Sequence, residues 1–290
     1  MGSNQHISQI FLSNQEENLP PFLIKTTSSV RRYYADHIHT IYNNQTLREF
    51  IKSNYNSEVL WAYDSLRPFS YKSDLGRFCI LYKHGGWYFD IAIKCLLKFE
   101  VNKEIDMISF RDEQRHSKTS WAAAGGIIWS KPNNEILLSA IEGIVQNCKD
   151  KWYGRTPLCP TGPALFGEAI ARNNRYKNII FGDLVRPKVP FTRKNLPIFR
   201  NLIKSKFILP NNKVIALVKP AKGGDLKSMI SEIHGKKTGC MNGLGGSMYL
   251  QDIKAGVAAA VPIVGSNIPI GTGIAYKSIF DNLNKRYVTA

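Results

Sequence analysis

Apolar and polar positions along this chain form short runs that predict strands and helices in alternation. Residues 7–12, 39–42 and 105–110 are brief apolar runs with the length and composition of buried strands. Residues 44–51 and 71–84 instead place apolar side chains three or four positions apart, as on one face of a helix. This alternation predicts an α/β fold built around a sheet.

The same reading applies to the remaining apolar segments. Residues 58–63 fit either a short strand or a helical turn, and a rigid loop rich in proline and glycine is expected at 152–163. Further helices are expected at 28–37, 133–145 and 164–171, and further strands at 121–129, 178–184, 206–209 and 213–218.

The pattern is most informative between residues 71 and 99. The helical spacing ends at Gly85 and Gly86, because glycine tolerates the left-handed backbone that follows many helices. The aromatic run Trp87–Phe89 has strand character. It places Asp90 at the end of the strand, where loops expose functional groups.

Three charged residues of this stretch are candidates for a polar pocket. Asp74 and Arg77 are three positions apart and therefore share one face of the predicted helix. Asp90 follows the next strand, so the fold can bring it beside them. The alternatives are an ordinary surface ion pair between Asp74 and Arg77, and a turn-capping role for Asp90.

Composition and charge narrow the class of partner. The 290 residues are 43% hydrophobic, enough for one large domain or two smaller ones, and the formal net charge is +17. This charge favours phosphorylated substrates and leaves peripheral contact with an anionic membrane open. Zinc-finger spacing, helix-turn-helix signatures and aromatic RNA-binding motifs are absent from the sequence, so we expect no nucleic-acid partner.

Cysteine usage and the N-terminal residues bear on the compartment. The five cysteines are widely spaced and form no C-x-x-C pair, so structural zinc is not expected and a reducing cytoplasm is the simplest setting. The first residues lack the basic and apolar regions of a signal peptide. We expect a cytoplasmic protein, with contact at the inner face of the membrane as an open alternative.

Four motifs follow one another along the first two thirds of the chain. They are Asp74-Leu75-Gly76-Arg77-Phe78, Gly85-Gly86-Trp87-Tyr88, Asp90-Ile91-Ala92 and Thr161-Gly162-Pro163. Together they resemble the motifs of DxD-containing glycosyltransferases, in particular family thirty-two and its capsule and lipopolysaccharide branch. The resemblance extends from Ile7 to about Lys219. It implies a GT-A nucleotide-diphospho-sugar transferase fold over a first domain, residues 1–220.

The resemblance also implies a reaction and a set of contacts. The family retains anomeric configuration and moves one sugar from a nucleotide-diphospho-sugar to an acceptor, here a surface-polysaccharide or lipid-linked glycan. Mn²⁺ or Mg²⁺ would stabilise the leaving diphosphate. By the family pattern, Asp74 and Arg77 would hold donor hydroxyls and phosphate, and Asp90 would hold the ribose and the metal. The remaining implied contacts are Gln9, Ile10 and Phe11 near the nucleobase, and Thr161, Gly162 and Pro163 in an acceptor-side loop.

One position departs from the family pattern. The second acid of the DxD motif is Ala92 in this chain, and a methyl group cannot coordinate a cation. Three interpretations follow. Asp112 or Asp183 supplies a compensating ligand, or the metal binds weakly through Asp90 and phosphate oxygens, or the protein is an inactive nucleotide-sugar-binding or interaction protein.

The tail has a second resemblance. Residues 221–290 carry Thr238-Gly239-Cys240, Gly243 to Met248 and Ile263-Val264-Gly265, and they resemble the α subunit of thiamine-diphosphate 2-oxo acid dehydrogenases. Tyr249 replaces that family's histidine, and its magnesium-binding Gly-Asp-Gly motif does not follow. We therefore expect a partial α/β fragment, joined by gene fusion near Pro220, that does not bind thiamine diphosphate. A thiamine-dependent dehydrogenase subunit is the remote alternative.

Overall fold

The computed structural model describes residues 6–13, 19–112, 120–173, 178–185 and 206–218, together with Ser231, residues 236–238 and Asn242. The predicted tail domain therefore lies almost entirely outside the described residues, including Tyr249 and the motifs after Thr238. All the helices and strands below fall within one unit of the chain, residues 1–190 and 201–219.

The predicted alternation of strands and helices is confirmed. The strands are β1 (His6–Ile10), β2 (Ile38–Tyr42), β3 (Gly86–Phe89), β4 (Ile93–Cys95), β5 (Met107–Arg111), β6 (Ala123–Ser130), β7 (Ile179–Val185), β8 (Lys206–Ile208) and β9 (Val214–Val218). The helices are α1 (Pro21–Tyr33), α2 (Asn44–Asn54), α3 (Ser57–Ser65), α4 (Phe69–His84), α6 (Glu135–Lys149) and α7 (Pro163–Arg172).

All nine strands belong to one mixed sheet, in the order β2-β1-β3-β6-β5-β7-β8-β9-β4. Strand β1 pairs parallel with β2 and with β3, and β5 pairs parallel with β7, whereas the other neighbours are antiparallel. Residues 90–92 alone connect β3, inside the sheet, to β4 at its far edge. So short a connection requires the sheet to curl until these two strands approach each other.

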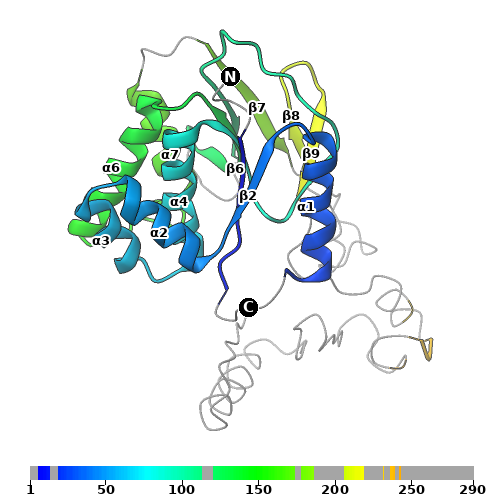
Figure 1. The fold of residues 1–290 in the computed structure, drawn as a ribbon, viewed down its shortest axis with the longest axis horizontal. Coiled ribbons are helices and arrows are strands. Elements are labelled where there is room, and N and C mark those ends of the chain that lie inside the picture. The colour runs from blue at the N-terminus through cyan, green and yellow to red at the C-terminus, as the bar shows by residue number, and fades with distance from the viewer. Residues whose placement is uncertain are drawn as a thin grey trace. The chain divides into compact units, whose positions relative to one another are not determined.

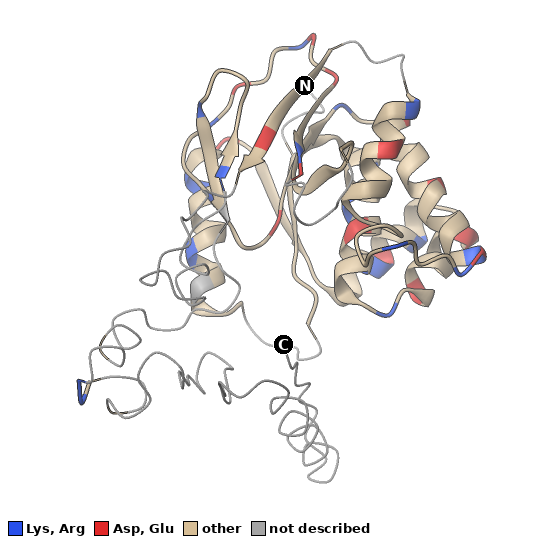
Figure 2. Cartoon of the chain, turned by 180° about the vertical axis from the view of Figure 1, so that it is seen from behind, with Lys and Arg blue, Asp and Glu red and all other residues tan. Residues whose placement is uncertain are grey.

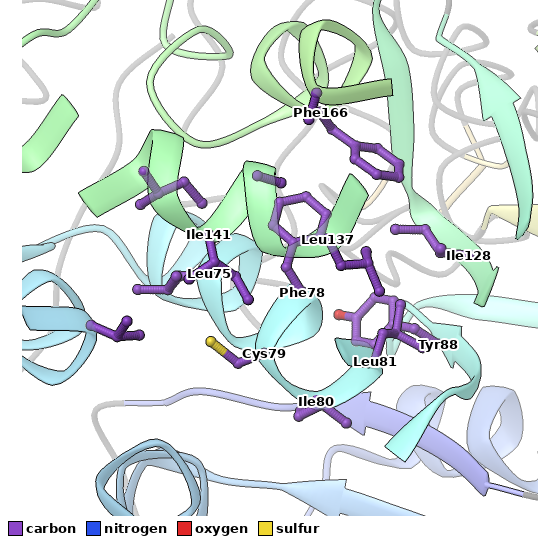
Figure 3. Close-up of a cluster of buried hydrophobic side chains, with 14 of the residues drawn as sticks. Leu75, Phe78, Cys79, Ile80, Leu81, Tyr88, Ile128, Leu137, Ile141 and Phe166 are labelled. Carbon is purple, nitrogen blue, oxygen red and sulfur yellow. The ribbon is translucent and has the colours of Figure 1, made fainter. Parts of the chain in front are cut away.

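Helices cover both faces of this sheet. Helices α2, α3, α4, α6 and α7 lie on one side and α1 lies on the other (Figure 1). Because successive strand residues point to opposite faces, Ile10 joins the core under α4 and Ile7 joins the core under α1. Phe78 of α4, Leu137 of α6 and Phe166 of α7 meet in the larger core (Figure 3).

Helix α3 decides between two predicted alternatives, and helix α1 begins earlier than predicted. Residues 58–63 are helical, as part of α3. Helix α1 begins at Pro21 rather than at residue 28, with proline in its first turn. Its threonine and serine residues interrupt the apolar spacing by which a helix is predicted. The side chains of Thr26 and Thr27 donate hydrogen bonds to the carbonyl of Leu23 inside the helix.

Candidate functional site

The turn between α4 and β3 places the charged residues of the site. Helix α4 ends at Gly85, with φ of 64°, and Gly86 follows with φ of 83°. A Cβ atom on Gly86 would lie 2.2 Å from the carbonyl oxygen of His6, so a side chain here would block the pairing of β3 with β1. The two glycines thus let the chain reverse sharply, and Asp90 comes to the end of β3 beside α4.

Arg77 is the centre of the cluster. Its Nη2 lies 3.2 Å from Oδ1 of Asp74, and its Nη1 lies 3.3 Å from Oδ1 of Asp90. The guanidinium also donates to the backbone carbonyls of Ser73 and Gly125. Burial alone would lower the pKa of Arg77, but Asp90, Tyr88 and Asp74 outweigh it and raise the pKa above its usual value. Arg77 therefore stays charged although it is 7% exposed.

Asp74 is held from the loop before α7. The hydroxyl of Thr161 donates to Oδ2 of Asp74 over 2.8 Å. A Cβ atom on Gly162 would lie 3.4 Å from the same oxygen and 3.0 Å from the carbonyl oxygen of Leu158, so the loop approaches closely here. Burial raises the pKa of Asp74 from 3.8 to about 6, against the opposing effect of Arg77. This carboxyl can therefore change protonation state close to neutral pH.

Asp90 is the more open of the two acids. Its side chain is 42% exposed. Its Oδ1 accepts a hydrogen bond from the Tyr88 hydroxyl over 2.9 Å in addition to the contact with Arg77. Burial raises the pKa of Tyr88 well above its usual range, so the phenol remains a donor. Within the described chain, Oδ2 of Asp90 has no hydrogen-bond partner and is available to a ligand.

Few described side chains near the cluster could coordinate a metal ion. Ala92 offers no oxygen from its side chain, and no group of three or more His, Cys, Asp or Glu residues that could hold an ion occurs among the described residues. Asp183 forms a two-point ion pair with Arg111, at 2.7 and 3.0 Å. The backbone of Asp112 donates to the carbonyl of Ala122. Among the described residues these acids do not build a cage for a resident ion, and Asp90, with its open Oδ2, would be the side chain that contacts one.

The predicted nucleobase contacts lie on β1 and just after it. Ile10 is 4% exposed and belongs to the core, and Phe11, beyond the strand, is half-buried. Gln9 is fully buried, and its Oε1 lies 2.8 Å from Nε2 of His39. Since Arg31 donates to the other ring nitrogen of His39, the ring carries its proton on Nε2 and donates to Gln9.

Three residues of the site were missed by the sequence reading. Tyr88 was expected in an aromatic strand and in the motif Gly85-Gly86-Trp87-Tyr88, but without a contact in the site. Its hydroxyl donates to Asp90, and its ring centroid lies 4.8 Å from the guanidinium carbon of Arg77. Gly125 and Gly126 of β6 leave room for the charges. A Cβ atom would lie 2.6 Å from Nη1 of Arg77 at position 125, and 3.2 Å from Oδ2 of Asp90 at position 126. Adjacent glycines inside a strand were the available signal of close approach.

Sequence comparisons find two kinds of relative. Residues 20–113 match the family described as "Glycosyltransferase sugar-binding region containing DXD motif". An uncharacterized glycosyltransferase of Acanthamoeba polyphaga mimivirus is 24% identical over 196 residues, covering 66% of this chain and 76% of the relative. The pyruvate dehydrogenase E1 α subunit of Rickettsia felis is 40% identical over 62 residues, 21% of this chain, and the chain spans only 19% of that relative's length.

Solved structures give more distant likenesses. The PaToxG glycosyltransferase aligns with a TM-score of 0.48 and 16% identity, over 59% of this chain and 70% of that one. A glycosyltransferase involved in glycosylation of the major capsid of PBCV-1 aligns with a TM-score of 0.30 and 11% identity, over 61% and 81%. The matched segment 20–113 contains Asp74, Arg77 and Asp90, so the charged cluster lies in a region similar to the sugar-binding region of DXD glycosyltransferases.

Proposed function

We propose that this chain is a glycosyltransferase that moves a sugar from a nucleotide-diphospho-sugar to a glycan or lipid-linked acceptor. The observation that carries the proposal is the contact of one buried arginine, Arg77, with both Asp74 and Asp90 inside the segment that matches the sugar-binding region. A GT-A-like arrangement of the curled mixed sheet is part of the same proposal.

The cluster suits the hydroxyls of a donor sugar. Carboxylate oxygens accept hydrogen bonds from hydroxyl groups, and Arg77 holds both acids in fixed positions before a ligand arrives. The open Oδ2 of Asp90 is the first contact we assign to the donor. The hydrogen bond from Thr161 directs one oxygen of Asp74 toward the loop before α7.

A diphosphate needs positive charge that this cluster does not supply, because two carboxylates outweigh one guanidinium. A divalent cation such as Mn²⁺ or Mg²⁺, when bound, would neutralise the charge that develops on the leaving diphosphate. We assign its protein contact to Asp90 alone, since Ala92 has no ligand atom. On this proposal the metal arrives with the donor, and affinity for the metal without donor is low.

The stereochemistry and the acceptor are finer parts of the proposal. We propose that the anomeric configuration is retained and that the acceptor belongs to a surface-polysaccharide pathway at an anionic membrane face. None of the described helices is long and apolar enough to cross a bilayer. In Figure 2 the described Lys and Arg residues are scattered among acidic ones. NMR of the released sugar, read before mutarotation, tests retention.

Donor hydrolysis is the experiment that tests the proposal. Wild-type protein is incubated with a panel of UDP- and GDP-sugars and Mn²⁺, and release of the nucleoside diphosphate is measured. We expect turnover with one donor and its loss in Asp90→Ala. The matched control is Asp64→Ala, whose acid is 39% exposed and forms an ion pair with Arg48; it should keep wild-type turnover. Equal turnover in wild type and Asp90→Ala would overturn the assigned site.

Ala92 favours a second candidate, an inactive protein that still binds a nucleotide sugar. On this alternative the wild type binds a donor in calorimetry without hydrolysing it, and Ala92→Asp gains turnover together with tighter binding of Mn²⁺. If the wild type turns over and Ala92→Asp does not bind Mn²⁺ more tightly, this candidate is excluded.

The tail remains a separate proposal. We propose that residues 221–290 are a fragment related to the dehydrogenase α subunit and that they bind no thiamine diphosphate. The motifs after Thr238 motivate this proposal, and the chain has a match of 62 residues to such a subunit. Calorimetry with thiamine diphosphate and Mg²⁺ tests it, and measurable binding would revive the remote dehydrogenase interpretation.

A further inference from the structure

The loop between α6 and α7 presents two adjacent aromatic side chains to solvent. Trp152 is 48% exposed and Tyr153 is 71% exposed. Single exposed apolar residues are common on protein surfaces and need no explanation. Here, however, the two neighbours share a loop with Thr161, the residue that bonds Asp74 of the proposed donor site.

The loop holds Trp152 in a defined position. Gly154 has a φ of 67°, and a Cβ atom on it would lie 2.9 Å from Cη2 of Trp152 and 2.3 Å from Cβ of Cys159. The edge of the indole therefore lies against Gly154. The backbone N–H of Trp152 donates to the carbonyl of Asn147, whose side-chain amide in turn donates to the carbonyl of Pro160. These bonds hold the loop backbone, and contact with Gly154 restricts the indole, so the ring loses less conformational entropy when a ligand stacks on it.

The position of the indole relates it to the donor site. Cη2 of Trp152 and Cβ of Cys159 both lie close to the same point at Gly154, and Thr161 is only two residues further along the chain. Since two residues span at most about 7 Å, the indole lies no more than about 14 Å from Thr161. This is within the length of a short oligosaccharide whose end reaches the donor sugar.

The charges beside the rings add a preference. Lys151 and Arg155 are exposed and have no ion-pair partner among the residues that the structure describes. The nearby acid Asp150 accepts two hydrogen bonds from the amide of Gln146. The rings are thus bordered by cations and suit a ligand that carries both sugar rings and negative groups.

We propose that Trp152 and Tyr153 form a stacking platform for the acceptor glycan, and that Lys151 and Arg155 favour an acidic one. The C–H face of a sugar ring packs on an aromatic face, whose quadrupole is negative. This inference rests on the proposed transferase function. Trp and Tyr also gather at membrane interfaces, but the fixed ring and its closeness to Thr161 favour the glycan.

Binding to an array of acidic and neutral oligosaccharides tests the platform in the full-length chain. We expect the wild type to bind acidic glycans, and the double variant Trp152→Ala/Tyr153→Ala to bind them about tenfold more weakly, as is typical of lost aromatic stacking. Trp61→Ala is the matched control, because Trp61 is also half exposed, at 46%, and lies on α3. The double variant should melt within a few degrees of the wild type, since both side chains lie in a surface loop and neither belongs to the buried core.

Other results overturn the platform. Equal glycan binding by wild type and double variant does so, and so does the absence of any bound glycan. Loss of binding to vesicles of phosphatidylcholine and phosphatidylglycerol with glycan binding unchanged would assign the two rings to a membrane instead. Lys151→Glu/Arg155→Glu should lose the preference for acidic over neutral glycans. Donor hydrolysis by the wild type tests the transferase proposal separately, so its failure is distinguishable from failure of the platform.

Discussion

Arg77 makes more polar contacts than a lysine could make in its place. Its guanidinium reaches two carboxylates and two backbone carbonyls at once. A lysine ammonium is a compact charge and cannot span these partners. The arrangement of the candidate site therefore depends on the shape of one side chain as well as on its charge.

Arg77→Lys should destabilise the protein by about 3 kcal/mol, because one buried carboxylate would lose its partner. Urea unfolding measures this change. The matched control is Arg48→Lys, which alters an exposed pair with Asp64 and should change stability by less than about 1 kcal/mol. Equal effects at the two positions would show that the contacts of Arg77 contribute no more to stability than an exposed ion pair does.

The raised pKa of Asp74 leads us to expect that the stability of the protein depends on pH. Its folded-state pKa is raised from 3.8 to about 6 by burial, so the folded protein binds this proton more tightly than the unfolded chain does. The stabilisation is fully present below about pH 4 and is lost as the pH rises to about 6, up to about 3 kcal/mol. Asp74→Asn lacks this titration and should gain stability relative to wild type over that range, measured by urea unfolding.

Asp36 is the control, because its pKa is shifted in the opposite direction to that of Asp74. Hydrogen bonds from Lys98 and His37 lower the pKa of Asp36 to about 2. Its contribution is therefore present above the unfolded-state pKa and is lost as the pH falls toward about 2. Asp36→Asn should show no relative gain between about pH 4 and about pH 6, and a gain there would undermine the assignment at Asp74.

Spacing in the sequence was sufficient to bring Asp74, Arg77 and Asp90 together as candidates, because two lie on one helix and the third ends the next strand. It could not find Tyr88 or Gly125, since their contacts depend on how β3 and β6 pair and on how α4 packs over them. The proline-glycine loop was predicted, but the bond from Thr161 to Asp74 joins residues far apart in sequence.

At the scale of elements, β6 supports the site because Gly125 has no side chain. Gly125 leaves the space into which Nη1 of Arg77 fits, and its carbonyl accepts a hydrogen bond from the same group. The strand was predicted at 121–129 and is found at Ala123–Ser130. The start of α1 was missed because threonine and serine weaken a helical pattern that proline and packing nevertheless establish.

Gly125→Ala should displace Arg77 and lower stability by about 1–3 kcal/mol, because the added methyl group overlaps the guanidinium. Thermal unfolding followed by circular dichroism measures the change. Gly143→Ala is the control: it lies in α6, where the new Cβ would meet Leu165 at an ordinary 3.4 Å. Alanine favours a helix over glycine, so this variant should be neutral or more stable.

At the scale of the molecule, the order of the strands is what the sequence could not predict. Strand existence follows from local apolar runs, but the pairing of β4 with β9 joins distant segments whose register no local pattern specifies. The last strand of the described sheet, β9, ends at Val218, two residues before the predicted boundary at 220. That boundary remains a prediction.

A variant ending at Pro220 should unfold cooperatively, with a melting temperature within a few degrees of the full-length chain. The physical reason is that β9 and its partners β8 and β4 all precede that residue. Differential scanning calorimetry measures both properties. Loss of a cooperative transition would show that the first domain needs residues beyond 220.

The short connection from β3 to β4, residues 90–92, has a consequence for how the protein folds around the candidate site. The hydroxyl of Thr26 on α1 bonds the carbonyl of Ile91, and β4 then pairs with β9, which is synthesised long after it. Contacts between distant segments form slowly, because the chain must close a long loop before they can form. On the ribosome, the segment after Asp90 would therefore wait for residues 214–218 to emerge.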